Sequence, residues 1–96
     1  MIAVVSKQKV KPDKVEEFRK AITEQAPKTR SDKGCVSMKV IQSPDQFTFM
    51  MDEVWESMEL FEEHLKGPGL AEFGAKIADF VDGDVEPFFG EIFVEV

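Results

Sequence analysis

The chain has 96 residues, which suits one compact domain and leaves no room for a second. Its net charge of −7 at pH 7 disfavours binding to the phosphate backbone of nucleic acids. No apolar stretch approaches the roughly 20 residues that span a membrane, and the N-terminus is too short and alternating for a signal peptide. A single cysteine, Cys35, allows no intrachain disulfide and fits a reducing cytosol. We therefore expect one cytoplasmic domain over residues 1–96.

The first elements are predicted by hydrophobic spacing. Residues 2–10 combine β-branched side chains with partial alternation, which predicts a strand. Asp13, followed three residues later by Glu16, resembles a capping box and predicts a helix start. One face of that helix carries Val15, Phe18, Ile22 and Ala26. Pro27 lies within this pattern, and because proline lacks an N–H and clashes with the preceding turn, we predict that the helix kinks or ends there.

Three further strands are predicted, over residues 35–43, 47–55 and 86–96. The turn cluster "SPDQ" joins the first two into a hairpin. After this hairpin, Ser57 is a good N-cap for a helix that Gly67-Pro68 ends, and another helical pattern follows. The order is therefore β-α-β-β-α-β with the second helix split in two, which predicts an α+β ferredoxin-like fold.

The strands over residues 47–55 and 86–96 carry apolar side chains on both faces. In a ferredoxin-like fold the helices cover only one face of the sheet, so the other apolar face needs a different cover. Four strands of about eight residues present a face of roughly 500 Å², which is near the most that a soluble monomer exposes. We therefore expect a C2 homodimer, sheet against sheet, with a monomer that exposes an apolar face as the alternative.

Four short segments resemble a known family. They are "VKPDKVEEF" (10–18), "KGC" (33–35), "EVWES" (53–57) and "EEHLKGP" (62–68). Together they resemble the antibiotic biosynthesis monooxygenase superfamily, over about residues 2 to 94, whose members include quinol monooxygenases. The resemblance implies a dimeric α+β barrel with a cavity between helices and sheet, and it places Trp55 and His64 at the wall of that cavity.

The chemistry of these two residues agrees with the resemblance. His64 adjoins the apolar face of its predicted helix, and an imidazole can take a proton near neutral pH. A hydroquinone or anthrone that loses a proton becomes an electron-rich anion that can reduce O2, and an indole can stack on such a planar ring. We predict a cofactor-independent monooxygenase with His64 as the catalytic base. The predicted substrate-binding residues are Trp55, Phe49, Met51, Phe61 and, if its side chain faces the cavity, Lys7.

The chain departs from two branches of the superfamily. The haem-degrading branch uses an Asn on the first strand, where this chain has Lys7, and the anthrone-oxidising branch uses Asn, Trp and Tyr. This chain has no Asn and no Tyr, which disfavours both branches. One His and no CxxC or HExxH motif make a strong zinc site unexpected. The alternatives are a non-catalytic dimeric barrel that binds a ligand or has a stress-associated role and, less favoured, a haem-degrading monooxygenase, for which His64 is the ligand candidate, or an isomerase. In each case a small molecule is the expected partner.

Overall fold

The computed structural model describes residues 1–96. The strands are β1 (Ile2–Lys9), β2 (Cys35–Gln42), β3 (Thr48–Trp55) and β4 (Glu86–Glu91). The helices are the short 3-10 helix η1 (Pro12–Lys14), α1 (Val15–Ser31), α2 (Met58–Lys66) and α3 (Pro68–Ile77). This order confirms the predicted β-α-β-β-α-β arrangement, with the second helix split into α2 and α3.

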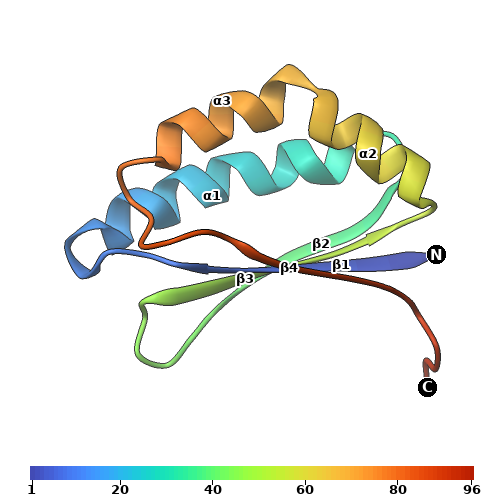
Figure 1. Cartoon of the computed structure of the whole chain (residues 1–96), viewed down its shortest axis with the longest axis horizontal. Coiled ribbons are helices and arrows are strands. Elements are labelled where there is room, and N and C mark those ends of the chain that lie inside the picture. Colours follow the sequence, from blue (N-terminus) through green and yellow to red (C-terminus); the bar gives the residue numbers. More distant parts are fainter.

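The four strands form one sheet in the order β2-β3-β1-β4, and every neighbouring pair is antiparallel. All three α-helices lie on the same face of this sheet, and no helix covers the other face (Figure 1). The architecture is therefore α+β and ferredoxin-like, as predicted. None of the helices combines the length and the apolar character that a membrane crossing requires.

The register of β3 decides which side chains reach the helices. Successive side chains of a strand point to opposite faces. Phe49, Glu53 and Trp55 are buried on the helix-facing side, and Met51 lies between them in the same alternation. Glu53 is paired with Val4 of β1 and Met38 of β2, so a carboxyl group lies on the helix-facing side of the sheet between apolar neighbours.

The beginning and the middle of α1 differ from prediction. Asp13 lies in η1, and no side chain caps the first turn of α1, so the predicted capping box does not form. The helix continues through Pro27 to Ser31, so the prediction that it ends at Pro27 is wrong, while a kink stays a prediction. Thr23, whose carbonyl loses its usual N–H partner, and Pro27 are both exposed, and water can replace the missing hydrogen bond there.

The last strand is shorter than predicted. It ends at Glu91, and residues 92–96 follow it without belonging to a strand. Phe93 is 96% exposed in this tail, and on the uncovered face of the sheet Phe88 is 71% exposed and Ile41 is 47% exposed. The apolar face that motivated the dimer prediction is thus present, and no part of the same chain covers it.

Two apolar clusters hold the helices on the sheet. The first consists of Ile2, Val4, Cys35, Trp55 and Phe61, and the second of Val10, Val15, Phe18, Ile22 and Phe49. Met38 packs against the first cluster and Met51 against the second. These two methionines therefore lie between the two clusters, and both line the cavity described below.

Both ends of α2 are fixed as predicted. Ser57 Oγ accepts a hydrogen bond from the Leu60 N–H at 3.2 Å, which is a typical N-cap. Gly67 ends the helix, and its N–H donates to the carbonyl of His64 at 3.2 Å before Pro68 begins α3. The turn of α2 that carries His64 is therefore held by the helix end and by the start of the next helix.

Candidate functional site

A cavity of about 280 Å³ lies between the helix-facing side of the sheet and the three α-helices. Nine of its 16 lining residues are hydrophobic, so the space is mainly apolar. The hydrophobic residues are Ile22, Met38, Met51, Phe61, Leu65, Leu70, Phe73, Ile77 and Val85. A mostly apolar, concave site with a few polar groups is the usual form of a small-molecule binding site.

The polar lining residues are Ser6, Gln8, Gln25, Thr29, Glu53 and His64, and no lysine or arginine lines the cavity. Some of these groups are already paired within the protein. Gln8 Nε2 donates to the carbonyls of Lys9 and Gly83, at 2.8 and 3.2 Å. Gln25 Nε2 donates to Thr29 Oγ1 at 3.3 Å. The two ionisable side chains of the cavity, Glu53 and His64, are therefore its main chemical features.

His64 is held by a carboxylate from the loop after α1. Its Nδ1 lies 2.5 Å from Asp32 Oδ2, its side chain is only 5% exposed, and that of Asp32 is 49% exposed. The imidazole ring also lies 4.9 Å from the Trp55 ring, centroid to centroid. His64 borders the inner cavity and two small surface hollows that Asp32 also lines. The imidazole thus lies between the cavity and the surface, with its Nδ1 directed to a carboxylate that reaches solvent.

Glu53 is the second ionisable group of the cavity, and its residue is 8% exposed. Trp55 Nε1 donates a hydrogen bond to Glu53 Oε1 at 2.9 Å. Burial raises the pKa of the Glu53 carboxyl, while the Trp55 hydrogen bond and the nearby His64 oppose that shift. The protein therefore keeps a carboxyl group in an environment that disfavours its charged form, with an indole N–H as its one hydrogen-bond donor.

Replacing Glu53 with glutamine is expected to change how stability depends on pH. Because the pKa of Glu53 is raised by folding, the folded protein binds more protons than the unfolded chain between the unfolded and folded pKa values. The extra bound proton stabilises the folded wild type at low pH, so the free energy of unfolding falls as pH rises through this interval. Glu53→Gln removes that loss, so the variant is expected to gain stability relative to wild type between pH 4 and pH 8.

Urea unfolding at both pH values measures this effect. Glu63→Gln is the matched control, because Glu63 is exposed on α2 and the substitution removes the same charge from the surface. A difference between Glu53→Gln and wild type that is the same at pH 4 and pH 8 would contradict the expected linkage.

The comparisons with known proteins place the chain in a family. The family model described as antibiotic biosynthesis monooxygenase matches residues 1–76. The chain belongs to the antibiotic biosynthesis monooxygenase family. A protein of Synechocystis sp. named uncharacterized protein sll1783 is 32% identical over 81 residues, which are 83% of this chain and 55% of that protein. The chain thus spans about half the length of this curated relative.

Solved structures share the fold over nearly the whole chain. A Nitrosomonas europaea protein, described as a candidate antibiotic biosynthesis monooxygenase, is 19% identical with a TM-score of 0.90, and the match covers 97% of this chain and 100% of that one. A Caulobacter crescentus protein with the same description is 25% identical with a TM-score of 0.89, covering 98% and 90%. A conserved Methanosarcina mazei protein is 26% identical with a TM-score of 0.86, covering 93% and 89%.

The structure brings together three of the residues predicted to form the site of this family member. Met51, Phe61 and His64 all line the cavity. Trp55 does not line it, because the residue is 0% exposed within the core. Its stacking on a ligand stays a prediction, and it would need a movement that uncovers the ring. Its N–H instead donates a hydrogen bond to Glu53, so Trp55 contacts the site through a residue that lines the cavity.

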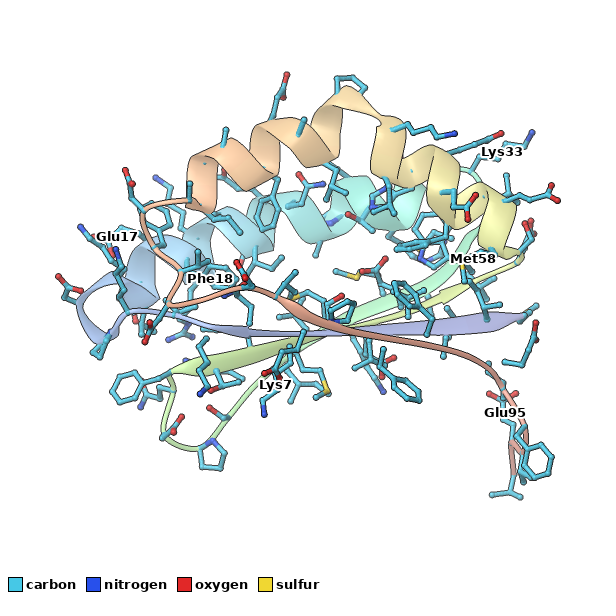
Figure 2. All side chains as sticks on the ribbon, viewed as in Figure 1. Lys7, Glu17, Phe18, Lys33, Met58 and Glu95 are labelled. Atoms are coloured by element: carbon cyan, nitrogen blue, oxygen red, sulfur yellow. The ribbon has the colours of Figure 1, made fainter.

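Two other predicted binding residues lie elsewhere. Lys7 is paired with Met50 and lies on the uncovered face, where its side chain points away from the helices (Figure 2). The alternation of β1 is the reason, since Ser6 and Gln8 are the β1 residues that reach the cavity. Phe49 packs against Phe18, with ring centroids 4.7 Å apart, and belongs to the core beside a different hollow.

Glu53 is the functional candidate that the sequence analysis missed. The alternation of β3 contains the signal, because Glu53 falls midway between Met51 and Trp55 on the same face. A carboxyl group on the otherwise apolar inward face of a strand is rare enough to need a reason. No three His, Cys, Asp or Glu side chains gather anywhere in the protein as a group that could hold a metal ion.

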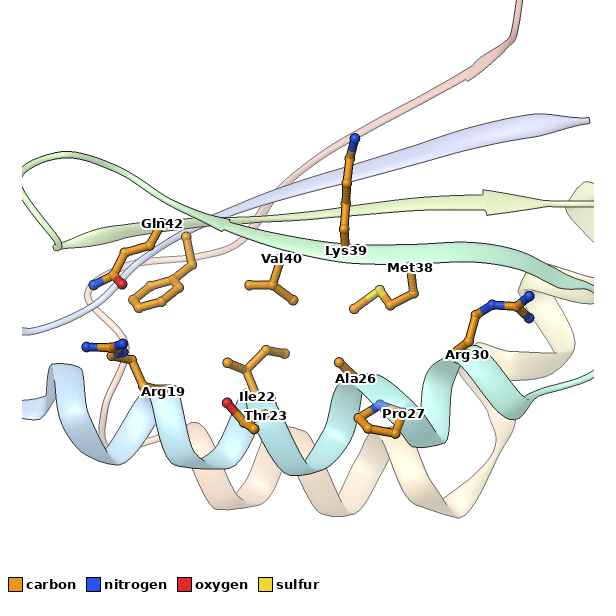
Figure 3. Close-up of a pocket in the computed structure, with 11 residues that line it drawn as sticks. Arg19, Ile22, Thr23, Ala26, Pro27, Arg30, Met38, Lys39, Val40 and Gln42 are labelled. Atoms are coloured by element: carbon orange, nitrogen blue, oxygen red, sulfur yellow. The ribbon is translucent and has the colours of Figure 1, made fainter.

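A wider hollow of about 520 Å³ lies between α1 and the edge strand β2. Figure 3 shows Ile22 and Ala26 of α1 facing Met38 and Val40 of β2, with an arginine toward each end of the groove. Arg19 is already bonded to Glu16, and Arg30 donates to the carbonyl of Cys35 at 2.8 Å. This groove contains neither His64 nor Glu53, so we place the site in the smaller cavity.

Proposed function

We propose that this member of the family is a cofactor-independent monooxygenase for a small aromatic substrate of the quinol type. The observation that carries the proposal is an imidazole that lines an apolar cavity while a carboxylate holds its Nδ1. Such a histidine can accept a proton at its other nitrogen, and the neighbouring carboxylate stabilises the imidazolium that forms. The family, the cavity and the His64–Asp32 pair support the same reaction class.

The size of the cavity limits the substrate to one or two rings. An engineered cavity of about 150 Å³ binds benzene, and the cavity here is about 280 Å³. Phe61 and Phe73 line it, and they offer aromatic surface to a planar ring. In the proposed pose a phenolic hydroxyl of the substrate donates to Nε2 of His64, because Nδ1 is occupied by Asp32.

The proposed reaction needs one proton transfer from the substrate to the protein. His64 takes the hydroxyl proton, and the resulting phenolate donates electrons to O2. For a hydroquinone, one oxygen atom enters the ring and the other leaves as water, so hydroquinone and O2 give hydroxyquinone and water. The apolar wall favours this outcome because it excludes water from the reactive anion and O2.

An oxygen electrode tests the proposal directly. Purified protein, treated with a metal chelator and shown to be free of flavin by its absorption spectrum, is mixed with hydroquinone at pH 7. We expect O2 uptake above the autoxidation rate, one O2 for each hydroxyquinone formed. A rate equal to autoxidation would contradict the proposal and favour a ligand-binding protein without catalytic activity.

We also propose that the protein is a homodimer through the uncovered face of its sheet. Phe88 and Ile41 are exposed on that face, and Val5 and Met50 are their cross-strand neighbours. Sedimentation velocity at micromolar concentration is expected to give a dimer, and Phe88→Lys is expected to shift it to monomer, because a lysine would be buried without a partner. Met58→Lys, at an exposed position on α2, is the control. A wild-type monomer at this concentration would contradict the dimer.

Haem is not expected to be degraded. Since benzene needs about 150 Å³, the four-ring macrocycle of haem needs several times more, and the cavity offers about 280 Å³. No lysine or arginine lines the cavity to pair with the haem propionates. After addition of haem and ascorbate, the Soret band should persist and no iron should be released. Rapid loss of the band together with iron release would overturn this expectation.

A further inference from the structure

Glu53 is buried, although the fold does not require a carboxyl group at its position. It is 8% exposed, and its cross-strand neighbours Val4 and Met38 are apolar. No lysine or arginine is its partner, and the charged form is destabilised by burial. A glutamine or a leucine would fit the same inward position at lower cost to stability. Buried groups that oppose stability are concentrated at functional sites.

One oxygen of Glu53 is available to a ligand. Oε1 accepts the hydrogen bond of Trp55 Nε1, and no protein group bonds to Oε2. Every fully enclosed side-chain nitrogen or oxygen in the protein has a hydrogen-bond partner. Oε2 is therefore not fully enclosed, and because Glu53 lines the cavity, this oxygen opens onto it.

Trp55 fixes the direction of that oxygen. Its ring is fully buried between the apolar cluster and His64, so the indole cannot turn without disturbing the core. Its N–H holds one carboxyl oxygen at 2.9 Å, which leaves the other oxygen in a defined place. Trp55 is thus a positioning residue for Glu53.

The charges around the cavity restrict what can enter. Glu53 is the acidic residue that lines it, and Asp32 is bonded to His64 on the side away from the cavity. Asp52 is the residue before Glu53 on β3 and lies on the opposite face of the sheet. No lysine or arginine lines the cavity. An anionic ligand would meet a carboxyl group and no full positive charge except a protonated His64.

We propose that Glu53 is a second substrate-binding residue, which accepts a hydrogen bond from one hydroxyl of an uncharged aromatic ring while His64 accepts from another. This inference rests on the proposed function for the location of the site. It adds the class of substrate that the site binds. The ring carries two hydrogen-bond donors and no carboxylate, sulfonate or phosphate group. The same carboxyl group that binds the hydroxyl excludes anionic phenols.

Calorimetric titration without oxygen tests the inference. Three compounds are compared at pH 8: hydroquinone with two hydroxyls, 4-methoxyphenol with one, and the anion 4-hydroxybenzenesulfonate. Wild type is expected to bind hydroquinone about 10- to 100-fold more tightly than 4-methoxyphenol, the usual worth of a hydrogen bond to a charged group. It is expected to bind the sulfonate more weakly than either.

Two variants assign the effect. Glu53→Gln keeps the shape of the side chain and, on the linkage described above, remains stable at this pH, so it is expected to fold. Its preference for hydroquinone over 4-methoxyphenol should fall to about 1, since an amide N–H can donate to either a hydroxyl or a methoxy oxygen, and its affinity for the sulfonate should rise. Trp55→Phe keeps Glu53 but removes the N–H, so the preference should fall only in part and the sulfonate should stay excluded.

The outcomes separate this inference from the proposed function. If Glu53→Gln prefers hydroquinone over 4-methoxyphenol as strongly as wild type does, the binding role of Glu53 is overturned. It is also overturned if wild type binds neither phenol, or binds the sulfonate as tightly as hydroquinone. If the predicted preferences hold but no O2 is consumed, the binding role of Glu53 stands and the oxygenase activity fails. If O2 is consumed but Glu53→Gln leaves the preferences unchanged, the activity stands and the role of Glu53 fails.

Discussion

Replacing His64 with alanine is expected to lower the turnover of hydroquinone by about 10²- to 10⁴-fold, the usual worth of a general base. The variant lacks the nitrogen that accepts the substrate proton, so the electron-rich phenolate does not form at neutral pH. Its fold should persist, because the imidazole lies at the boundary between the cavity and the surface hollows. Turnover per folded molecule, with folding monitored by circular dichroism, is the quantity to compare.

Two further variants separate catalysis from structure. Asp32→Asn keeps a hydrogen-bond acceptor for Nδ1 but removes the negative charge, so its turnover should fall less than that of His64→Ala. Glu63→Ala, on the exposed side of the same helix, should leave turnover unchanged. A His64→Ala protein that unfolds more easily but keeps its turnover per folded molecule would show that His64 is a structural residue.

Gly34→Ala is expected to destabilise the protein by about 2 to 5 kcal/mol, the sum of left-handed backbone strain and overpacking. Gly34 has a φ of +90°, which side chains with a Cβ rarely adopt. A Cβ at this position would lie 2.6 Å from Leu60 Cδ1 and 2.7 Å from Leu60 Cβ, so α2 would have to move away from the sheet. Because His64 is on α2 and Asp32 is two residues before Gly34, this shift should also weaken the pair between them.

Gly83→Ala is the matched control for the backbone strain. Gly83 has a φ of +88°, but no atom lies within 4 Å of a Cβ built there. Its destabilisation should therefore be limited to about 1 to 2 kcal/mol, the left-handed term alone. Urea unfolding of both variants measures the difference. Equal losses of stability at the two positions would show that the contact with Leu60 has no effect.

The fold could be predicted largely from local signals. Alternation in β1 and β3, the cap at Ser57 and the Gly67-Pro68 break all act within a few residues of one another, so they are visible in the sequence. The continuation of α1 through Pro27 could not be predicted, because it depends on whether the freed carbonyl reaches water, and this is decided by how α1 packs. The end of β4 likewise depends on its pairing with β1.

The site could be predicted only in part. His64, Met51 and Phe61 reach the cavity because helical and strand periodicity place them on inward faces. The place of Lys7 depended on the parity of β1, which the sequence did not decide. Trp55 is on the expected face, but full burial and a hydrogen bond to Glu53 are properties of the packed core. The inward position of Glu53 follows from the alternation of β3, but its burial and its bond to Trp55 depend on how the helices pack on the sheet.

The oxygenase reaction is tested most directly by oxygen-isotope labelling. Chelator-treated protein is incubated with hydroquinone under ¹⁸O2, and the hydroxyquinone is analysed at once by mass spectrometry, with His64→Ala in parallel. The proposed mechanism predicts one ¹⁸O atom in the product formed by wild type and, beyond autoxidation, no labelled product from His64→Ala. Unlabelled hydroxyquinone, or equal labelled product from both proteins, would contradict an oxygenation that depends on His64.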